Sequence, residues 1–434
     1  MKLDTRRTIL VGFAFMAICA FWQVYDSIVP LILKDTFDMN DTLSGAIMAA
    51  DNVLALFLLP FFGSLSDRTQ TRIGRRMPYI LFGTALACVF ALLLPLANAG
   101  RNLPLFLTAL ALVLLSMAIF RSPAVALMPD VTVKPLRSRA NAIINLTGTI
   151  GGVLMLGAIA VLVPKGEHPN YLPLYLFLIA FMALAVLVLF LTVREPQLHQ
   201  KMLADSEGLP DEVEEQSAGG KLPPAMRRSL LLVLASIFLW YMGYNAITTA
   251  FSKYANVYWG LEGGSFAYTL IIAQGAAIAA YIPAGLVATK IGRRKTILCG
   301  IAMLAVAFGS CAFFKSFGGM IFFFFVLAGV GWASINVNSY PMVVEMSRGG
   351  DIGKYTGYYY TTSMAAQVLT PILSGAVLEY GWLALGSADP NAGYVLLFPY
   401  GTLFVALSFV TMFFVRHGDA KPVGKKDKLE AFGE

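Results

Sequence analysis

The chain has 434 residues, of which 58% are hydrophobic and only 13% are charged, and it carries a formal net charge of +7. An ordinary soluble domain contains about 25% charged residues, so this composition excludes a water-soluble globular protein. Apolar runs of about twenty residues, each long enough to cross a lipid bilayer, dominate the sequence.

These runs predict twelve membrane-spanning helices, and hence an all-α membrane protein. In chain order they cover residues 8–33, 43–65, 78–98, 103–128, 138–163, 171–193, 229–257, 264–289, 295–315, 317–345, 354–381 and 392–415. No small-residue cleavage pattern follows the first run, so we interpret it as a retained helix and not as a signal peptide.

A polar, acidic stretch over residues 194–228 separates the spans into two groups of six. It is too poor in apolar residues to bury a core of its own. The sequence therefore predicts an N-terminal six-helix bundle over 1–193, a cytoplasmic linker over 194–228, a C-terminal bundle over 229–415 and a cytoplasmic tail over 416–434.

The basic residues lie mainly on one side of these predicted spans. If the N-terminus is cytoplasmic, 26 of the 32 lysines and arginines fall in cytoplasmic segments. This asymmetry follows the positive-inside rule and predicts a cell (inner) membrane protein with both termini in the cytoplasm. The positive net charge then reflects membrane topology and gives no reason to expect a nucleic-acid partner.

The two halves repeat each other in their cytoplasmic segments. Residues 63–76 after the second span read GSLSDRTQTRIGRR, and residues 285–294 after the eighth span read GLVATKIGRR. Asp130 precedes Arg139 by nine residues, as Glu345 precedes Lys354. The two repeats recur at offsets of 218 and 215 residues, which indicates an internally duplicated transporter with pseudo-symmetric halves.

The first of these loops resembles the signature loop of the major facilitator superfamily. Its longer form, SDRTQTRIGRRMPY over residues 66–79, is similar to the loop of the glycoside-pentoside-hexuronide symporters and of the sucrose transporters of plants and their animal relatives. In those families Asp-Arg is followed by a short polar insert and then by Gly-Arg-Arg-x-Pro-Tyr/Phe. The resemblance implies a secondary transporter for sugars, and the region from Pro123 to Asn145 adds to it.

The repeated loops predict a latch that closes the cytoplasmic side of each half. Glycines allow close backbone approach, and arginines bind carboxylates and helix C-termini. The predicted gating residues are Gly63, Asp67, Arg68, Gly74, Arg75, Arg76, Asp130 and Arg139 in the first half, and Gly285, Gly292, Arg293, Arg294, Glu345 and Lys354 in the second. The alternative is that the arginines only retain topology, and we prefer it for Arg72 and Lys295 taken alone.

Three ionisable residues, Asp26, Asp51 and Arg121, fall inside predicted spans. A charge at a helix centre costs about 2.5 to 3.5 kcal/mol on insertion scales, so each calls for a functional explanation. By residue count the two acids lie at a similar depth, and a carboxyl group there would be a reversible proton carrier. The related families also place an arginine in the fourth span, but in the plant sucrose carriers it stands where Val125 lies here. Asp51 could instead cap or flank its helix.

The coupling ion is predicted from residues that are missing. Sodium symporters of the melibiose type carry two acids one turn apart before Pro-x-x-Gly in the second span. Here Pro60-Phe-Phe-Gly63 is present, but the two acid positions are Ala55 and Leu59. A sodium ion needs several oxygen ligands, by analogy with other hard cations, so we expect protons to couple transport.

A sugar site requires hydrogen-bonding groups and aromatic faces at mid-membrane. The predicted substrate-binding residues are Trp22, Gln23, Tyr25, Asn52, Asn145, Tyr241, Tyr244, Asn245, Gln274, Asn336, Asn338, Tyr359 and Gln367. All are uncharged, which suits a neutral polyol better than a phosphorylated or carboxylated solute. Each could instead hold helices together by hydrogen bonds, Asn145 and Gln274 in particular.

Other function classes lack their motifs. The sequence has no Gly-x4-Gly-Lys-Ser/Thr for an ATP-driven pump and no His-Glu-x-x-His for a metalloenzyme, so we expect neither an enzyme nor a cofactor or metal. The four cysteines lie scattered in apolar runs, as buried hydrophobic residues do. A monomeric proton-coupled symporter of a disaccharide or related glycoside is the main prediction, and a proton-driven exporter of amphipathic drugs is the alternative.

Overall fold

A computed structural model describes residues 3–133, 136–166, 169–206, 223–344, 346 and 352–417. Within this part of the chain the regular secondary structure is helical, without strands, and twelve helices are long and apolar enough to cross a membrane. The prediction of an all-α membrane protein with twelve spanning helices is confirmed.

The helices fall into two compact units. Unit 1 contains α1 (Thr5–Asp35), α2 (Asp41–Arg68), α3 (Met77–Ala99), α4 (Leu103–Asp130), α5 (Arg137–Leu162), α6 (Leu172–Thr192) and the short α7 (Glu195–Ser206). Unit 2 contains α8 (Pro224–Val257), most of α9 (Ala267–Ile291), α10 (Arg293–Cys311), α11 (Met320–Val344), α12 (Ile352–Ala384), the 3-10 helix η2 (Pro390–Leu396) and α13 (Leu397–Phe413). The segment Leu261–Ile271, with the first turn of α9, groups with unit 1.

Local sequence signals set several helix starts. The side-chain oxygen of Asn40 accepts a hydrogen bond from the backbone N–H of Leu43 at 2.8 Å, and Asn102 accepts one from Leu105 at 3.0 Å. An N-cap side chain of this kind satisfies one of the backbone N–H groups that a helix start leaves unpaired. Prolines stand in the first turn of α3, α4, α6 and α8, where a missing N–H costs nothing.

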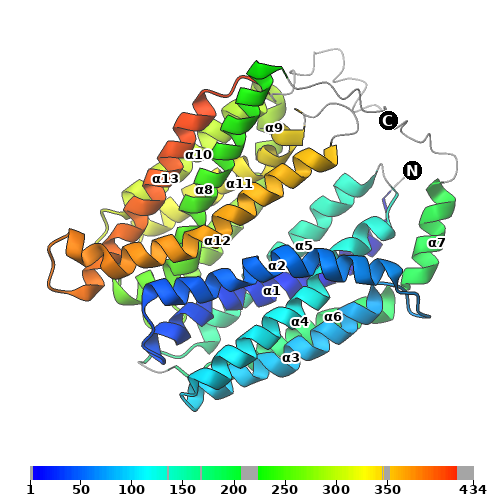
Figure 1. Ribbon diagram of the computed structural model, residues 1–434, viewed down its shortest axis with the longest axis horizontal. Helices are drawn as coiled ribbons and strands as arrows, with labels where there is room; N and C mark the ends of the chain where they lie inside the picture. Colours follow the sequence, from blue (N-terminus) through cyan, green and yellow to red (C-terminus); the bar gives the residue numbers. More distant parts are fainter. Residues whose placement is uncertain are drawn as a thin grey trace. The chain divides into compact units, whose positions relative to one another are not determined.

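In unit 1, α1 packs on α5 and α6, α3 packs on α4 and α6, and α2 packs on α4 (Figure 1). The contact between α3 and α4 depends on Gly83. A Cβ atom at that position would lie 2.7 Å from the backbone nitrogen of Phe120, so a larger residue would force the two helices apart. Close backbone approach through small residues is how helices associate within lipid.

Unit 2 repeats four of these helix pairs. Its first spanning helix, α8, packs on α12 and α13, and α10 packs on α11 and α13. These pairs correspond to those that α1 and α3 make in unit 1. The sequence repeat between the two halves is therefore matched by a repeat of helix packing.

Candidate functional site: an intramembrane charge cluster and a loop network

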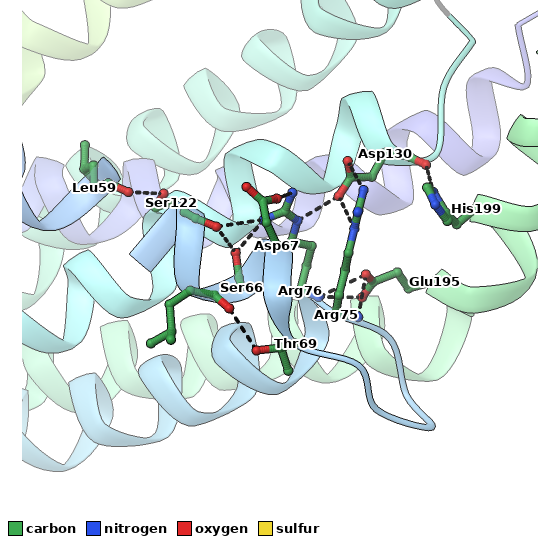
Figure 2. Close-up of polar contacts among 12 residues, drawn as sticks. Leu59, Ser66, Asp67, Thr69, Arg75, Arg76, Ser122, Asp130, Glu195 and His199 are labelled. Atoms are coloured by element: carbon green, nitrogen blue, oxygen red, sulfur yellow. Dashed lines mark hydrogen bonds and ion pairs between the residues drawn. The ribbon is translucent and has the colours of Figure 1, made fainter. Parts of the chain in front are cut away.

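The loop network is formed by Asp67, Arg75, Arg76, Asp130 and Glu195 of unit 1 (Figure 2). Arg75 binds Asp130 through two nitrogens, Nε at 3.1 Å and Nη2 at 2.6 Å from the carboxylate oxygens. The Nε of Arg76 lies 2.7 Å from Asp130, and its Nη2 pairs with Asp67. One acid at the end of α4 thus holds two arginines at the start of α3, and one of these arginines also reaches the end of α2.

Arg76 is the buried centre of this network, with 4% of its surface exposed. Its Nη1 also donates to the backbone carbonyl of Gly63 at 3.3 Å and to the hydroxyl of Ser66. Burial alone would lower the pKa of Arg76, but the hydrogen bonds and charges of Asp130 and Asp67 outweigh it and hold that pKa above its usual value. The guanidinium therefore stays charged at any physiological pH.

Glu195, the first residue of α7, completes the network by binding the start of α3. Its carboxylate accepts hydrogen bonds from three backbone N–H groups, those of Arg75 at 2.9 Å, Arg76 at 2.9 and 3.1 Å, and Met77 at 2.9 Å. Only 2% of Glu195 is exposed. A helix N-terminus carries unpaired N–H groups and a partial positive charge, so a buried carboxylate there satisfies both.

The glycine of the signature loop is explained by this carboxylate. Gly74 has φ +117°, a conformation that residues with side chains rarely adopt, and a Cβ there would lie 2.2 Å from Oε2 of Glu195. The loop therefore needs glycine for two reasons, its backbone conformation and the space taken by Glu195.

Helix α7 is held to unit 1 by a second contact. Nδ1 of His199 lies 2.8 Å from the backbone carbonyl oxygen of Asp130 and donates its hydrogen to it (Figure 2). Glu195 and His199 are one helical turn apart, so they point to the same side of α7. The helix that follows the sixth span thus contacts both the start of α3 and the end of α4.

Glu195 and His199 are not among the residues predicted from the sequence, although a signal for them exists. Residues 193–195 after α6 read Val-Arg-Glu, and residues 415–417 after α13 read Val-Arg-His, an offset of 222 that is close to those of the other repeats. In unit 2, His417 replaces the glutamate, and its Nδ1 lies 2.8 Å from the hydroxyl oxygen of Ser229.

The remaining predicted gating residues are placed as follows. Arg68 is exposed at the end of α2, and Gly63 faces the hydroxyl of Ser122. Gly292, with φ +93°, caps α10, and Arg294 donates to the carbonyl of Phe413 and lies 5.9 Å from the centre of its ring.

The last gating positions are four in the C-terminal half and Arg139 in the N-terminal half. Gly285 has its nearest neighbour, Val337, at an ordinary 3.8 Å, and Arg293 is half-buried at the start of α10. Glu345 and the side chains of Arg139 and Lys354 lie outside the described residues. Their pairing stays a prediction, and the contacts described for Asp130 are with Arg75 and Arg76.

The intramembrane charge cluster consists of Asp26 on α1, Asp51 on α2 and Arg121 on α4, all half-buried within unit 1. Asp51 interacts electrostatically with Arg121, and Asp26 with Asp51. The amide of Asn52 donates to Asp51 at 2.9 Å. Asp51 is therefore the residue that interacts with both the other acid and the arginine, which sequence counting did not specify.

Aromatic and amide side chains of α1 surround this cluster. The guanidinium carbon of Arg121 lies 5.6 Å from the ring centre of Trp22, a distance typical of a cation–π contact, and the indole N–H of Trp22 is buried without a hydrogen-bond partner. Gln23 donates to Ser27 at 3.1 Å. Tyr25 is only 2% exposed, and its hydroxyl donates to the Met48 carbonyl at 3.4 Å.

In unit 2 the predicted substrate residues gather around an unpredicted tryptophan. The ring of Tyr244 stacks on Trp332 at 3.6 Å between centroids, and Tyr241 meets Trp332 edge-on at 5.5 Å. Tyr241 also interacts with Tyr359. The side-chain nitrogen of Asn245 is buried without a partner. Aromatic rings and an unpaired amide nitrogen on the same helix, α8, are groups of the kind that a polyhydroxylated ligand requires.

The other predicted substrate residues make local contacts. Tyr359 is 5% exposed and shares a hydrogen bond of 3.2 Å with Ser339. The side-chain amides of Asn145, Asn338 and Gln367 each donate a hydrogen bond to the backbone carbonyl four residues earlier in the same helix. Asn336 and Gln274 are half-buried. Among the described residues, no group of three or more His, Cys, Asp or Glu side chains is arranged to hold a metal ion.

Comparison with known proteins gives a consistent picture of the fold. The sequence profile of the Major Facilitator Superfamily matches residues 11–280 and 233–432. The chain is 20% identical over 283 residues to the isoprimeverose transporter of Lactiplantibacillus pentosus, a match that covers 63% of this chain and spans 57% of that relative's length.

Solved structures of several transporters are similar across nearly the whole chain. The inward-open xylose transporter XylE from E. coli is similar with a TM-score of 0.64, at 14% identity and over 99% of both chains. The nucleoside transporter NupG is similar with a TM-score of 0.67, at 13% identity, over 94% of this chain and 99% of that one. A peptide transporter of the POT family, PepTSo, reaches 0.66 at 10% identity, over 95% and 98% of the two chains. At such low identities these likenesses show the fold alone.

Proposed function

The chain belongs to the major facilitator superfamily, and from that premise we propose that it is a proton-coupled sugar symporter that works by alternating access. The observation that carries the proposal is the intramembrane charge cluster, in which Asp26 and Asp51 interact electrostatically with each other and Asp51 interacts with Arg121. Charges inside a membrane protein are costly and mark ion or proton pathways.

Protons are favoured over sodium by the composition of the cluster. Its arginine supplies a positive charge beside Asp51, which would repel a sodium ion there. The second span also lacks the acid pair of the sodium symporters, with Ala55 and Leu59 at those positions. A proton needs only one carboxyl group that faces the transport path, and Asp26 and Asp51 are both available.

A sugar is favoured as the substrate by the signature loop and by two relatives. Residues 66–79 resemble the loop of sugar symporters, one matched relative is an isoprimeverose transporter, and XylE is a xylose transporter. The aromatic group around Trp332, with the unpaired amide of Asn245, supplies a face and a hydrogen-bond donor for such a ligand. We infer insertion in the inner membrane, with both termini cytoplasmic, from the distribution of lysine and arginine.

We propose that the loop network acts as the cytoplasmic latch of the N-terminal half. Asp67, Arg76 and Asp130 link the ends of α2, α3 and α4, so movement of one of these helices has to break a charged contact. Contacts that exist in one conformation and break in another bias the equilibrium between inward- and outward-facing states.

The test is uptake into proteoliposomes with an imposed proton gradient. Radiolabelled sucrose, radiolabelled D-xylose and a lipophilic cation are compared for the purified protein and for Asp26→Asn. We expect saturable, gradient-dependent uptake of a sugar that Asp26→Asn abolishes. Asp38→Asn is the matched control, because Asp38 is an exposed acid three residues after the end of the same helix and has φ +50°, which asparagine tolerates. Gradient-driven movement of the cation alone would instead identify a drug exporter.

A further inference from the structure

Three buried tyrosines of unit 1 lie between the intramembrane charge cluster and the end of α1. Tyr25 is on α1, Tyr171 stands at the start of α6, and Tyr175 is one turn further along α6. Their exposed fractions are 2%, 1% and 1%. Helices α1 and α6 pack directly on each other, and Tyr171 and Tyr175, four residues apart, share one face of α6.

Each tyrosine has the next group of the series as an electrostatic neighbour. Tyr171 interacts with Asp35, the last residue of α1, and with Tyr175. Tyr25 interacts with Tyr175 on one side and with Asp26 and Asp51 on the other. The series therefore runs from Asp35 through the three hydroxyl groups to the acids of the cluster.

The dimensions of α1 suit a series of short steps. Asp26 and Asp35 are nine residues apart, which corresponds to about 13 Å along a helix. Tyr171 and Tyr175, four residues apart, are separated by about 6 Å along α6, a gap between hydroxyl groups that one bridging water spans.

The hydroxyl of Tyr175 is the unusual member of the series, because it is buried without a hydrogen-bond partner. A buried hydroxyl normally has a partner, either protein or water, since leaving it unpaired costs about 1 to 3 kcal/mol. A water beside Tyr175 would satisfy it and would complete the series. A tyrosine hydroxyl both donates and accepts, so it passes a proton on without becoming a stable ion.

We propose that Tyr171, Tyr175 and Tyr25 form the proton-entry route of the N-terminal half, leading from Asp35 at the outer surface to Asp26 and Asp51. The route rests on the proposed proton coupling and on the proposed orientation, which places the end of α1 outside. A proton taken up at Asp35 moves inward by exchange along hydroxyls and water, each group accepting one proton and releasing another, and protonates an acid of the cluster. No bond other than O–H bonds forms or breaks.

The decisive variant is Tyr175→Phe, which removes one oxygen and keeps the ring. Because that oxygen has no partner, we expect the melting temperature of the variant to equal or exceed that of the parent protein. Tyr400→Phe is the matched control, since Tyr400 on α13 also has a buried hydroxyl without a partner and lies in unit 2.

The assay compares two modes of sucrose transport, or of D-xylose transport if that sugar is the better substrate. Gradient-driven uptake requires proton entry, whereas equilibrium exchange of labelled for unlabelled sugar requires no net proton movement. We expect Tyr175→Phe to slow gradient-driven uptake at least tenfold and to leave exchange within twofold of the parent, while Tyr400→Phe changes neither.

Two results would overturn the route. Gradient-driven uptake at the parent rate would show that protons do not need Tyr175, and an equal loss of both modes would show that the residue only supports the structure. Absence of gradient-driven sugar uptake in the parent protein is a different result, since it would overturn the proposed function itself.

Discussion

The contact between Gly74 and Glu195 predicts that substitutions at these two positions are not additive. Gly74→Ala places a Cβ 2.2 Å from Oε2 and 2.4 Å from Cδ of Glu195, at φ +117°. Overpacking costs about 1 to 3 kcal/mol, and an unfavourable backbone conformation costs a similar amount. We therefore expect the single variant to lose about 2 to 6 kcal/mol of stability.

Glu195→Ala is destabilising for a different reason. It leaves the backbone N–H groups of Arg75, Arg76 and Met77 without their carboxylate acceptor. Hydrogen bonds to charged groups contribute about 1.5 to 3 kcal/mol each, and water replaces part of this. We expect a net loss of about 3 to 5 kcal/mol from this single variant.

In the double variant the clash with the carboxylate is absent, because the carboxylate has been removed. The strain at φ +117° remains, so the combined loss should fall short of the sum of the single losses by about 1 to 3 kcal/mol, as for residues in direct contact. The measurement is the melting temperature in detergent, where 1 kcal/mol corresponds to about 2 to 4 °C for a unit of roughly 200 residues.

The control for this cycle is Gly100→Ala combined with Glu195→Ala. Gly100 has an ordinary backbone conformation, and a Cβ there meets its nearest atom at 3.4 Å, so the two losses should add. Losses that also add to within about 0.5 kcal/mol for Gly74→Ala and Glu195→Ala would refute the reasoning that Glu195 dictates the glycine.

Three further outcomes are expected. Asp130→Asn should reduce stability and sugar uptake more than Asp67→Asn, because the side chain of Asp130 is 13% exposed and that of Asp67 is 56% exposed; equal effects in melting and uptake assays would contradict this. Gly83→Ala should lower the melting temperature by the equivalent of about 1 to 3 kcal/mol, since its Cβ would lie 2.7 Å from the nitrogen of Phe120, and an unchanged value would show that α3 and α4 move apart freely. His199→Ala should cost about 1 kcal/mol through the lost bond to the Asp130 carbonyl, and more rapid proteolysis of α7 would report its release.

The twelve spans and the internal repeat follow from the sequence alone. In a bilayer every backbone polar group has to be satisfied within the segment, so an apolar run of sufficient length predicts a helix with little ambiguity. The repeat of GRR at residues 74–76 and 292–294 likewise needs no structure to be seen, because it lies in the order of the residues. Such signals can be read from the residue order without knowing which side chains contact each other.

The partners of the charged residues were decided by tertiary structure. The sequence indicated that Asp130 belongs to a latch and suggested a pairing with Arg139, nine residues away. Arg75 and Arg76 were predicted to belong to the same network, and the described contacts of Asp130 are with these two residues, more than fifty positions earlier, because α3 packs on α4. The pairing with Arg139 stays a prediction. The carboxylate of Glu195 binds backbone N–H groups about 120 positions away, and the hydropathy pattern gives no indication of this contact.

The same distinction holds inside the membrane. Composition marked Asp26, Asp51 and Arg121 as costly and therefore functional, since few residues of this kind occur within spans. It did not determine that Asp51 interacts with both of the others, or that Tyr175 of α6 interacts with Tyr25 of α1 and has an unpaired hydroxyl. Helix rotation and depth settle such contacts, and these depend on how side chains from distant segments pack together.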